Sequence, residues 1–174
     1  MINKIIFTTI SLLMLGFLYS DNKLQPVLKN QNLKNIKIEV GIESITKNGD
    51  EYIIAVYAVN PFDEIAGIQF KILDEELFYI DSVYGGKTSD KDFSMHFNKK
   101  GTILGFSMVG DTIERTKIVS HTDRKLKNIL FYLKAKANNL SENITIIMDT
   151  VIASKEGKPL SSEFIPFSLS DIKQ

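Results

Sequence analysis

Short runs that alternate apolar and polar residues, each followed by a turn signal, recur along this chain from residue 64 onward. In the clearest run, Ile68, Phe70 and Ile72 point to one side, while Gln69 and Lys71 point to the other. A period of two is typical of a β-strand with one buried face. Many such strands in one chain predict a sandwich or a barrel, folds that usually present binding surfaces on a rigid frame.

The composition excludes several classes of function. The 174 residues are enough for one domain with a substantial core. Lysine and arginine together number 21, as do aspartate and glutamate, so the basic excess of a nucleic-acid-binding protein is missing. The chain has no cysteine and two histidines, which excludes disulfides and cysteine zinc sites and argues against a histidine-rich metal site. We therefore expect no nucleic acid partner, no metal and no cofactor.

The first 20 residues have the layout of a secretory signal peptide. Lys4 provides a positive start, residues 5–18 are almost continuously apolar, and polar residues follow from Asp21. The apolar run is shorter than the about 20 residues that span a bilayer. We expect residues 1–20 to be a signal peptide, with an uncleaved membrane anchor as the alternative. The mature protein would then be secreted or held at the cell surface, without membrane contact.

We expect about nine strands after a polar leader at residues 21–35, within a domain at residues 36–170. Asn48-Gly49 predicts a hairpin turn because both residue types tolerate positive φ. Residues 125–137 fit a helix or a strand, and their aromatic residues favour a strand. Pro166 predicts an edge position for the last strand. The expected strands are residues 36–45, 52–59, 65–73, 77–84, 93–98, 102–109, 125–137, 144–153 and 164–169.

Four stretches of this sequence, and the order in which they occur, resemble the cohesin domain. They are residues 66–70, residues 80–86 followed by Phe93, residues 103–107, and Leu126, Ile129 and Phe131; residues 145–160 then resemble its closing strand and Gly-Lys-Pro turn. The resemblance covers about residues 37–169. It implies an all-β fold, an antiparallel two-sheet β-sandwich of jelly-roll type that cohesins share with several carbohydrate-binding modules. It also implies a non-catalytic module that binds either a dockerin-like protein or a polysaccharide.

Candidate catalytic or metal-binding groups are few. Acidic residues cluster at residues 63–64, 74–76, 90 and 92. Two carboxylates roughly 5–9.5 Å apart would suit glycoside hydrolysis, and six to eight oxygens would suit calcium. These residues lie in expected turns, and the Asp-x-Asp-x-Asp-Gly calcium loop is absent. The simpler interpretation is that they are solvent-exposed turn residues. His96 is expected to point outward, with no Gly-x-Ser-x-Gly motif to accompany it. We therefore assign no catalytic residue.

The aromatic residues bear on carbohydrate binding. Sugars commonly stack on exposed flat rings, above all tryptophan, which this chain lacks. The rings that we expect to be partly exposed are Phe62, Tyr79, Tyr84 and Tyr132. Burying a ring stabilises a fold by about 1.5–3 kcal/mol, so we assign Phe70, Phe93, Phe97, Phe106 and Phe131 to the core. Within residues 93–98 this places Phe93, Met95 and Phe97 on the inward side.

The sequence therefore predicts an exported, non-enzymatic, cohesin-like module that docks an extracellular protein on a sheet face. Outward positions on the strands that resemble the family's binding sheet are the candidate contacts: Gln69, Lys71, Ser94, His96, Asn98 and Ser107. One alternative is a carbohydrate-binding module, which requires coplanar exposed tyrosines. Another is a structural subunit of a surface assembly, in which an edge strand pairs with a neighbour. A small hydrolase with facing carboxylates is the third.

Overall fold

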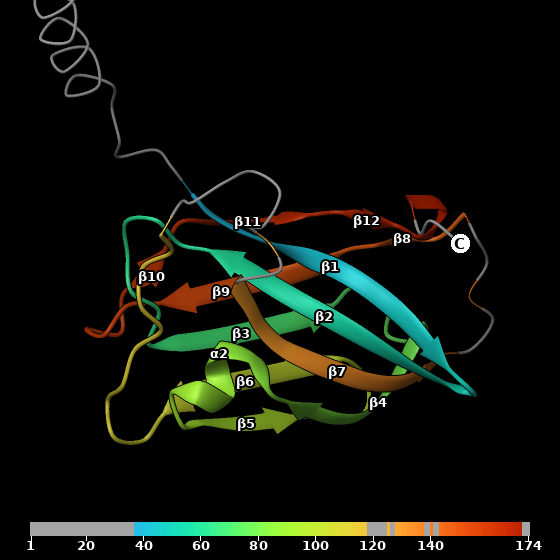
Figure 1. The fold of residues 1–174 in the computed structure, drawn as a ribbon, viewed down its shortest axis with the longest axis horizontal. Coiled ribbons are helices and arrows are strands. Elements are labelled where there is room, and N and C mark those ends of the chain that lie inside the picture. Colours follow the sequence, from blue (N-terminus) through green and yellow to red (C-terminus); the bar gives the residue numbers. More distant parts are fainter. Residues whose placement is uncertain (1–36, 118–124, 126–127, 138–139, 141–142, 172–174) are drawn as a thin grey trace, which may run out of the picture. The chain divides into compact units, whose positions relative to one another are not determined.

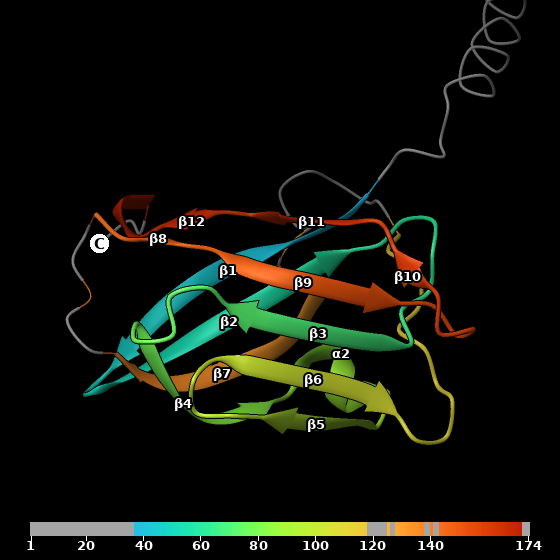
Figure 2. The same cartoon turned by 180° about the vertical axis from the view of Figure 1, so that it is seen from behind.

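Two β-sheets face each other in the computed structural model, which describes residues 37–117, 125, 128–137, 140 and 143–171 (Figures 1 and 2). The predicted signal peptide and polar leader lie outside these residues. The elements are β1 (Ile38–Asn48), β2 (Glu51–Val59), β3 (Gly67–Ile72), β4 (Phe78–Tyr84), α2 (Gly86–Asp90), β5 (Phe93–Phe97), β6 (Thr102–Ser107), β7 (Ile129–Ala137), β8 (Thr145–Ile146), β9 (Met148–Ala153), β10 (Pro159–Leu160), β11 (Ser162–Ile165), β12 (Phe167–Ser168) and the 3-10 turn η3 (Leu169–Asp171).

Each of the two main sheets has five strands. One has the order β11-β1-β2-β7-β4 and the other β10-β9-β3-β6-β5, while β12 and β8 form a separate two-stranded ribbon. Neighbouring strands are antiparallel, except that β1 pairs in parallel with β11. The predicted all-β, antiparallel two-sheet sandwich is confirmed.

Apart from shifts of a few residues at strand ends, three differences from the expected elements stand out. The chain changes sheets at Ile147, so that the predicted strand 144–153 is divided into β8, which pairs with β12, and β9, which pairs with β3. Pro166 separates β11 from β12, because proline has no N–H to donate to a ladder. The short helix α2 between β4 and β5 was not predicted. Its five residues are too few to show a helical period.

The β1–β2 hairpin confirms the turn signal but shifts it by one residue. Asn48 pairs with Glu51 and is the last residue of β1, so the two turn residues are Gly49 and Asp50. Gly49 has φ +63°. The glycine therefore supplies the left-handed conformation that the turn needs.

Residues 129–137 form a strand, as predicted, with one irregularity at Leu130. Val56 of β2 pairs with Phe131, but the next residue, Tyr57, pairs with Ile129. Ile129 therefore belongs to an outer cluster with Tyr57, whereas Phe131, Leu133 and Leu130 belong to the core. In a regular strand Ile129 would share the inward face of Phe131, but the bulge at Leu130 reverses the alternation.

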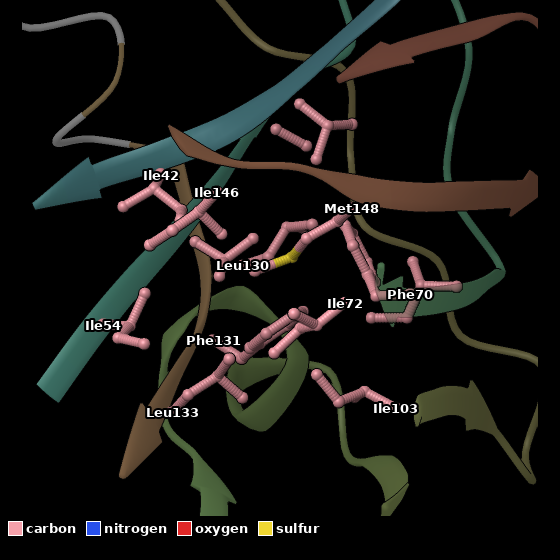
Figure 3. Packing of buried hydrophobic residues seen from close by; sticks show 14 of the residues in the cluster. Ile42, Ile54, Phe70, Ile72, Ile103, Leu130, Phe131, Leu133, Ile146 and Met148 are labelled. Atoms are coloured by element: carbon pink, nitrogen blue, oxygen red, sulfur yellow. The ribbon is translucent and has the colours of Figure 1, made fainter. Parts of the chain in front are cut away.

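The core lies between the two main sheets and joins residues from both (Figure 3). At its centre, the rings of Phe70 on β3 and Phe131 on β7 meet edge to face, with their centroids 5.2 Å apart and their planes at 80°. Both side chains are fully buried, and Ile54 and Leu133 from one sheet and Ile72 and Ile103 from the other are buried with them. Edge-to-face contact adds about 0.5–1.5 kcal/mol to the stabilisation from burial alone.

A buried polar network holds the β6–β7 connection against the end of β2. The Asn60 side chain, which is fully buried, donates through Nδ2 to the carbonyl oxygens of Asp63 (2.8 Å) and Glu114 (3.1 Å). Its Oδ1 accepts from the Thr116 hydroxyl at 2.8 Å. The Thr116 hydroxyl in turn accepts from the Asn60 N–H at 3.1 Å and lies 3.5 Å from Oδ1 of Asn128. These hydrogen bonds hold Glu114, Thr116 and Asn128 close to one another.

The Asn60→Ala variant is expected to lose about 2–4 kcal/mol of unfolding free energy, because three side-chain hydrogen bonds vanish, the buried Thr116 hydroxyl loses its acceptor and two partly buried carbonyl groups lose their donor. Chemical denaturation followed by circular dichroism measures this loss. Asn48→Ala, at an exposed asparagine, is the control and should change stability by less than about 0.5 kcal/mol. Equal stability of the two variants would show that the network contributes nothing.

Candidate functional site

The outer face of the β10-β9-β3-β6-β5 sheet carries an exposed row of side chains. The strand register sets His96 of β5 beside Leu104 of β6, Leu104 beside Gln69 of β3, and Gln69 beside Val151 of β9. All four residues are exposed. Together with their outward neighbours they form a surface that we call the β3–β6 face: Gln69, Lys71, Ser94, His96, Leu104, Phe106 and Val151.

Exposed apolar residues lie on both sides of Gln69 in the β3–β6 face. Leu104 is 40% exposed and Val151 is 48% exposed. The imidazole of His96 stacks on the ring of Phe106, with centroids 5.9 Å apart and planes at 21°. Just beyond β6, Met108 is 74% exposed. Contiguous exposed apolar side chains on a folded domain are typical of an interaction surface.

Phe106 belongs to this outer surface, so the expectation that it lies in the core was wrong. In β6 the inward residues are Ile103, which is fully buried, and Gly105. A Cβ atom at Gly105 would lie 2.5 Å from Sδ of Met95, which shows that the Met95 side chain fills the space that the glycine leaves. Because β6 has apolar residues on both faces, alternation alone did not reveal which face is inward.

Phe97 was also wrongly assigned to the core, for a different reason. It pairs with Ile103 and therefore lies on the inward side of β5, as predicted. However, β5 is at the edge of its sheet, and the ring is 41% exposed. The core assignments of Phe70, Phe93 and Phe131 are confirmed.

The structure brings four of the six predicted contact residues onto one surface. Gln69, Lys71, Ser94 and His96 lie on the β3–β6 face. Nζ of Lys71 also forms a salt bridge of 3.1 Å with Oε1 of Glu75, where both side chains are about half exposed. The sequence predicted this polar part of the surface, whereas the apolar residues Leu104, Phe106 and Val151 were missed because apolar strand residues were assigned to the core.

Asn98 and Ser107 lie apart from that row and take part in turns. Oδ1 of Asn98 accepts hydrogen bonds from the N–H groups of Lys100 and Thr102, both at 3.0 Å. Oγ of Ser107 accepts from the N–H of Asp111 at 3.0 Å, and Ser107 pairs with the buried Phe93. These contacts give both residues a structural role.

The predicted exposed rings are exposed, but they do not form an open platform. Phe62, Tyr79 and Tyr84 are 41%, 44% and 43% exposed. Tyr84 stacks on Tyr132, with centroids 5.8 Å apart and planes at 26°, and Nζ of Lys99 lies 4.9 Å from the centroid of Tyr79. One face of each of these tyrosine rings is thus already in contact with another side chain.

The acidic turn residues occupy separate corners. Asp74 accepts a hydrogen bond from the N–H of Glu76 at 3.2 Å, and Glu64 accepts one from the Thr112 hydroxyl at 2.7 Å. Within the residues that the structure describes, no three acidic or histidine side chains are grouped so that they could hold a metal ion. None of the helices in this same part of the chain is long and apolar enough to cross a membrane.

The fold resembles solved cohesin structures. A non-cellulosomal cohesin from the hyperthermophilic archaeon Archaeoglobus fulgidus matches with a TM-score of 0.52 and 15% sequence identity, over 75% of this chain and 88% of that chain. A structure of a CaDoc0917–CaCohA2 complex matches with a TM-score of 0.52 and 14% identity, over 75% and 96%. A type I cohesin–dockerin complex from Clostridium thermocellum has a TM-score of 0.46 and 12% identity, over 75% and 96%. No protein-family model and no curated protein sequence matches this chain.

Proposed function

Because this chain has a cohesin-like fold, we propose that it is a non-catalytic module that docks another extracellular protein on the β3–β6 face. The proposal rests on the exposed apolar residues of that face. Leu104 and Phe106 of β6 and Val151 of β9 flank Gln69, which lies on the middle strand β3. Protein–protein interfaces combine apolar and polar side chains in this way.

The rigidity of the surface supports docking. β3 has ladder partners on both sides, β6 and β9, and β6 is paired on both sides by β3 and β5. The central residues are therefore held at fixed spacing before any partner arrives. A preorganised surface loses little conformational entropy on association, so more of the contact energy contributes to affinity.

A protein is the partner that this surface fits best. Among the similar structures, CaCohA2 is in complex with CaDoc0917, at a TM-score of 0.52. On this chain, the β3–β6 face mixes polar side chains with the apolar Leu104, Phe106 and Val151, whereas the exposed tyrosines Tyr79 and Tyr84 lie on β4 and pack on Lys99 and Tyr132. The signal-like start of the sequence supports an extracellular location for the docking event.

The Leu104→Glu variant tests the proposal. A carboxylate at the centre of a desolvated interface should weaken partner capture at least tenfold, which corresponds to about 1.4 kcal/mol. The measurement is quantitative capture of proteins from the culture medium of the source organism, followed by affinity measurement with the protein recovered. Ile165→Glu is the matched control, because Ile165 is 39% exposed on β11, outside the β3–β6 face.

Binding that Leu104→Glu leaves unchanged would contradict the proposal, as would equal loss in both variants. Selective binding of the wild-type chain to a glycan array, without any protein partner, would instead support the carbohydrate alternative. Concentration-dependent self-association in sedimentation experiments would support the assembly alternative.

A further inference from the structure

Lys87 on α2 and Asn128, just before β7, bring an amine and a carboxamide together at a second site. The Lys87 ammonium group donates to Oδ1 of Asn128 at 2.5 Å, although the two residues are 41 positions apart. Ordinary N–H···O hydrogen bonds measure about 2.7–3.2 Å. Since Oδ1 is one bond from Cγ, the lysine nitrogen also lies next to the carboxamide carbon. Both residues line a cavity of about 400 Å³ between α2 and the β6–β7 connection.

Two glycines allow the backbone of α2 to lie close to the backbone of β7, next to this pair. Gly85 and Gly86 both have positive φ and bring α2 against β7, where a Cβ at Gly86 would lie only 2.4 Å from the Leu130 carbonyl oxygen. The Thr88 hydroxyl anchors the helix to the same Leu130 carbonyl oxygen at 3.0 Å. Asn128 is 5% exposed. The half-buried amine and the buried carboxamide therefore meet in a fixed position, which is the condition for a high effective concentration.

The surroundings also suit reaction of an amine with an amide. Burial lowers the pKa of Lys87, with the negative charges of Glu114 and Asp90 acting in the opposite direction. A lower pKa increases the fraction of neutral, nucleophilic amine.

Glu114 is the candidate for the group that moves protons in this reaction. Its carboxylate lines the same cavity and accepts a hydrogen bond from Nζ of Lys91 at 2.9 Å. Lys91 lowers the pKa of Glu114, and Lys117 and Lys87 act in the same direction. The carboxylate is therefore ionised at neutral pH, the form in which a general base acts, while its lowered pKa makes it a weaker base than an unperturbed carboxylate.

We propose that Lys87 and Asn128 form an intramolecular amide bond. Nζ of Lys87 attacks Cγ of Asn128, the Nζ–Cγ bond forms, and the Cγ–Nδ2 bond breaks. Glu114 accepts the proton that Nζ releases and returns it to Nδ2, which departs as ammonia. No oxidant, metal or further reactant is needed. This cysteine-free chain thereby gains a covalent link between α2 and β7.

Mass spectrometry of the full-length wild-type chain, after prolonged incubation of the folded protein, tests the proposal. The intact mass is expected to fall by one ammonia relative to the Lys87→Arg variant, after correction for the substitution. Proteolysis should then release a branched peptide that joins Lys87 to residue 128. Glu114→Gln should leave a larger fraction unlinked, whereas Glu163→Gln, at a surface acid that pairs with Lys37, should link like the wild type.

A folded wild-type chain that keeps its full mass would overturn the proposal, whatever the variants do. Loss of ammonia that persists in Lys87→Arg would overturn it too, because cyclisation elsewhere in the chain would then be the source. The docking proposal would be unaffected by either result, since the β3–β6 face contains none of these residues.

Discussion

Replacing Phe131 by alanine is expected to lower the free energy of unfolding by about 3–5 kcal/mol, the usual cost of removing a fully buried ring. Phe131 is fully buried and contacts Phe70 across the two sheets, at 5.2 Å between centroids. The substitution removes the burial energy of the ring, the edge-to-face contact and the packing at the sheet interface. The sheets cannot close the gap without moving whole strands, so a cavity should remain.

Equilibrium unfolding in guanidinium chloride, followed by circular dichroism, measures this effect. Phe97→Ala is the matched control, because Phe97 is the same residue type but is 41% exposed on an edge strand. It should cost less than about 1.5 kcal/mol. A cost for Phe131→Ala no larger than that for Phe97→Ala would mean that the space between the sheets is not the stabilising core.

The Gly86→Ala variant is expected to lose about 2–5 kcal/mol of unfolding free energy. Gly86 has φ +63°, which costs a residue with a Cβ about 1–2 kcal/mol. In addition, the new Cβ would lie 2.4 Å from the carbonyl oxygen of Leu130 and 2.9 Å from that of Ile129. These neighbours are backbone atoms of a sheet strand, so either α2 or the start of β7 must move, which adds about 1–3 kcal/mol.

Gly157→Ala separates the two contributions to this effect. Gly157 has φ +72°, but nothing lies within 4 Å of the position that a Cβ would take. Its substitution should therefore cost only the conformational term of about 1–2 kcal/mol. Thermal or chemical unfolding of both variants gives the difference. If the two glycines prove equally tolerant, the close packing of α2 on β7 does not contribute to stability. Any displacement of α2 in Gly86→Ala should also reduce formation of the Lys87–Asn128 bond.

The sequence predicted the candidate surface only in part. The alternation of β3 placed Gln69 and Lys71 outward and Ile68 and Phe70 inward, and the structure agrees. In β6, however, Leu104 and Phe106 are apolar and outward, while the inward partner of Met95 is the glycine at position 105. A pattern that assigns apolar residues to the core cannot identify apolar residues that serve an interface, because both environments favour the same side chains.

The sequence by itself determined most of the strands, the approximate place of the β1–β2 turn and the sandwich class, because side-chain alternation and turn residues act over a few neighbouring positions. The tertiary structure alone decided which face of β6 is inward, the reversal of alternation at Leu130 and the parallel pairing of β1 with β11. The tertiary structure also brings Lys87 into contact with Asn128, although the two residues are 41 positions apart. These features depend on which distant segments share the limited space between and beside the sheets, and no local residue pattern carries that information.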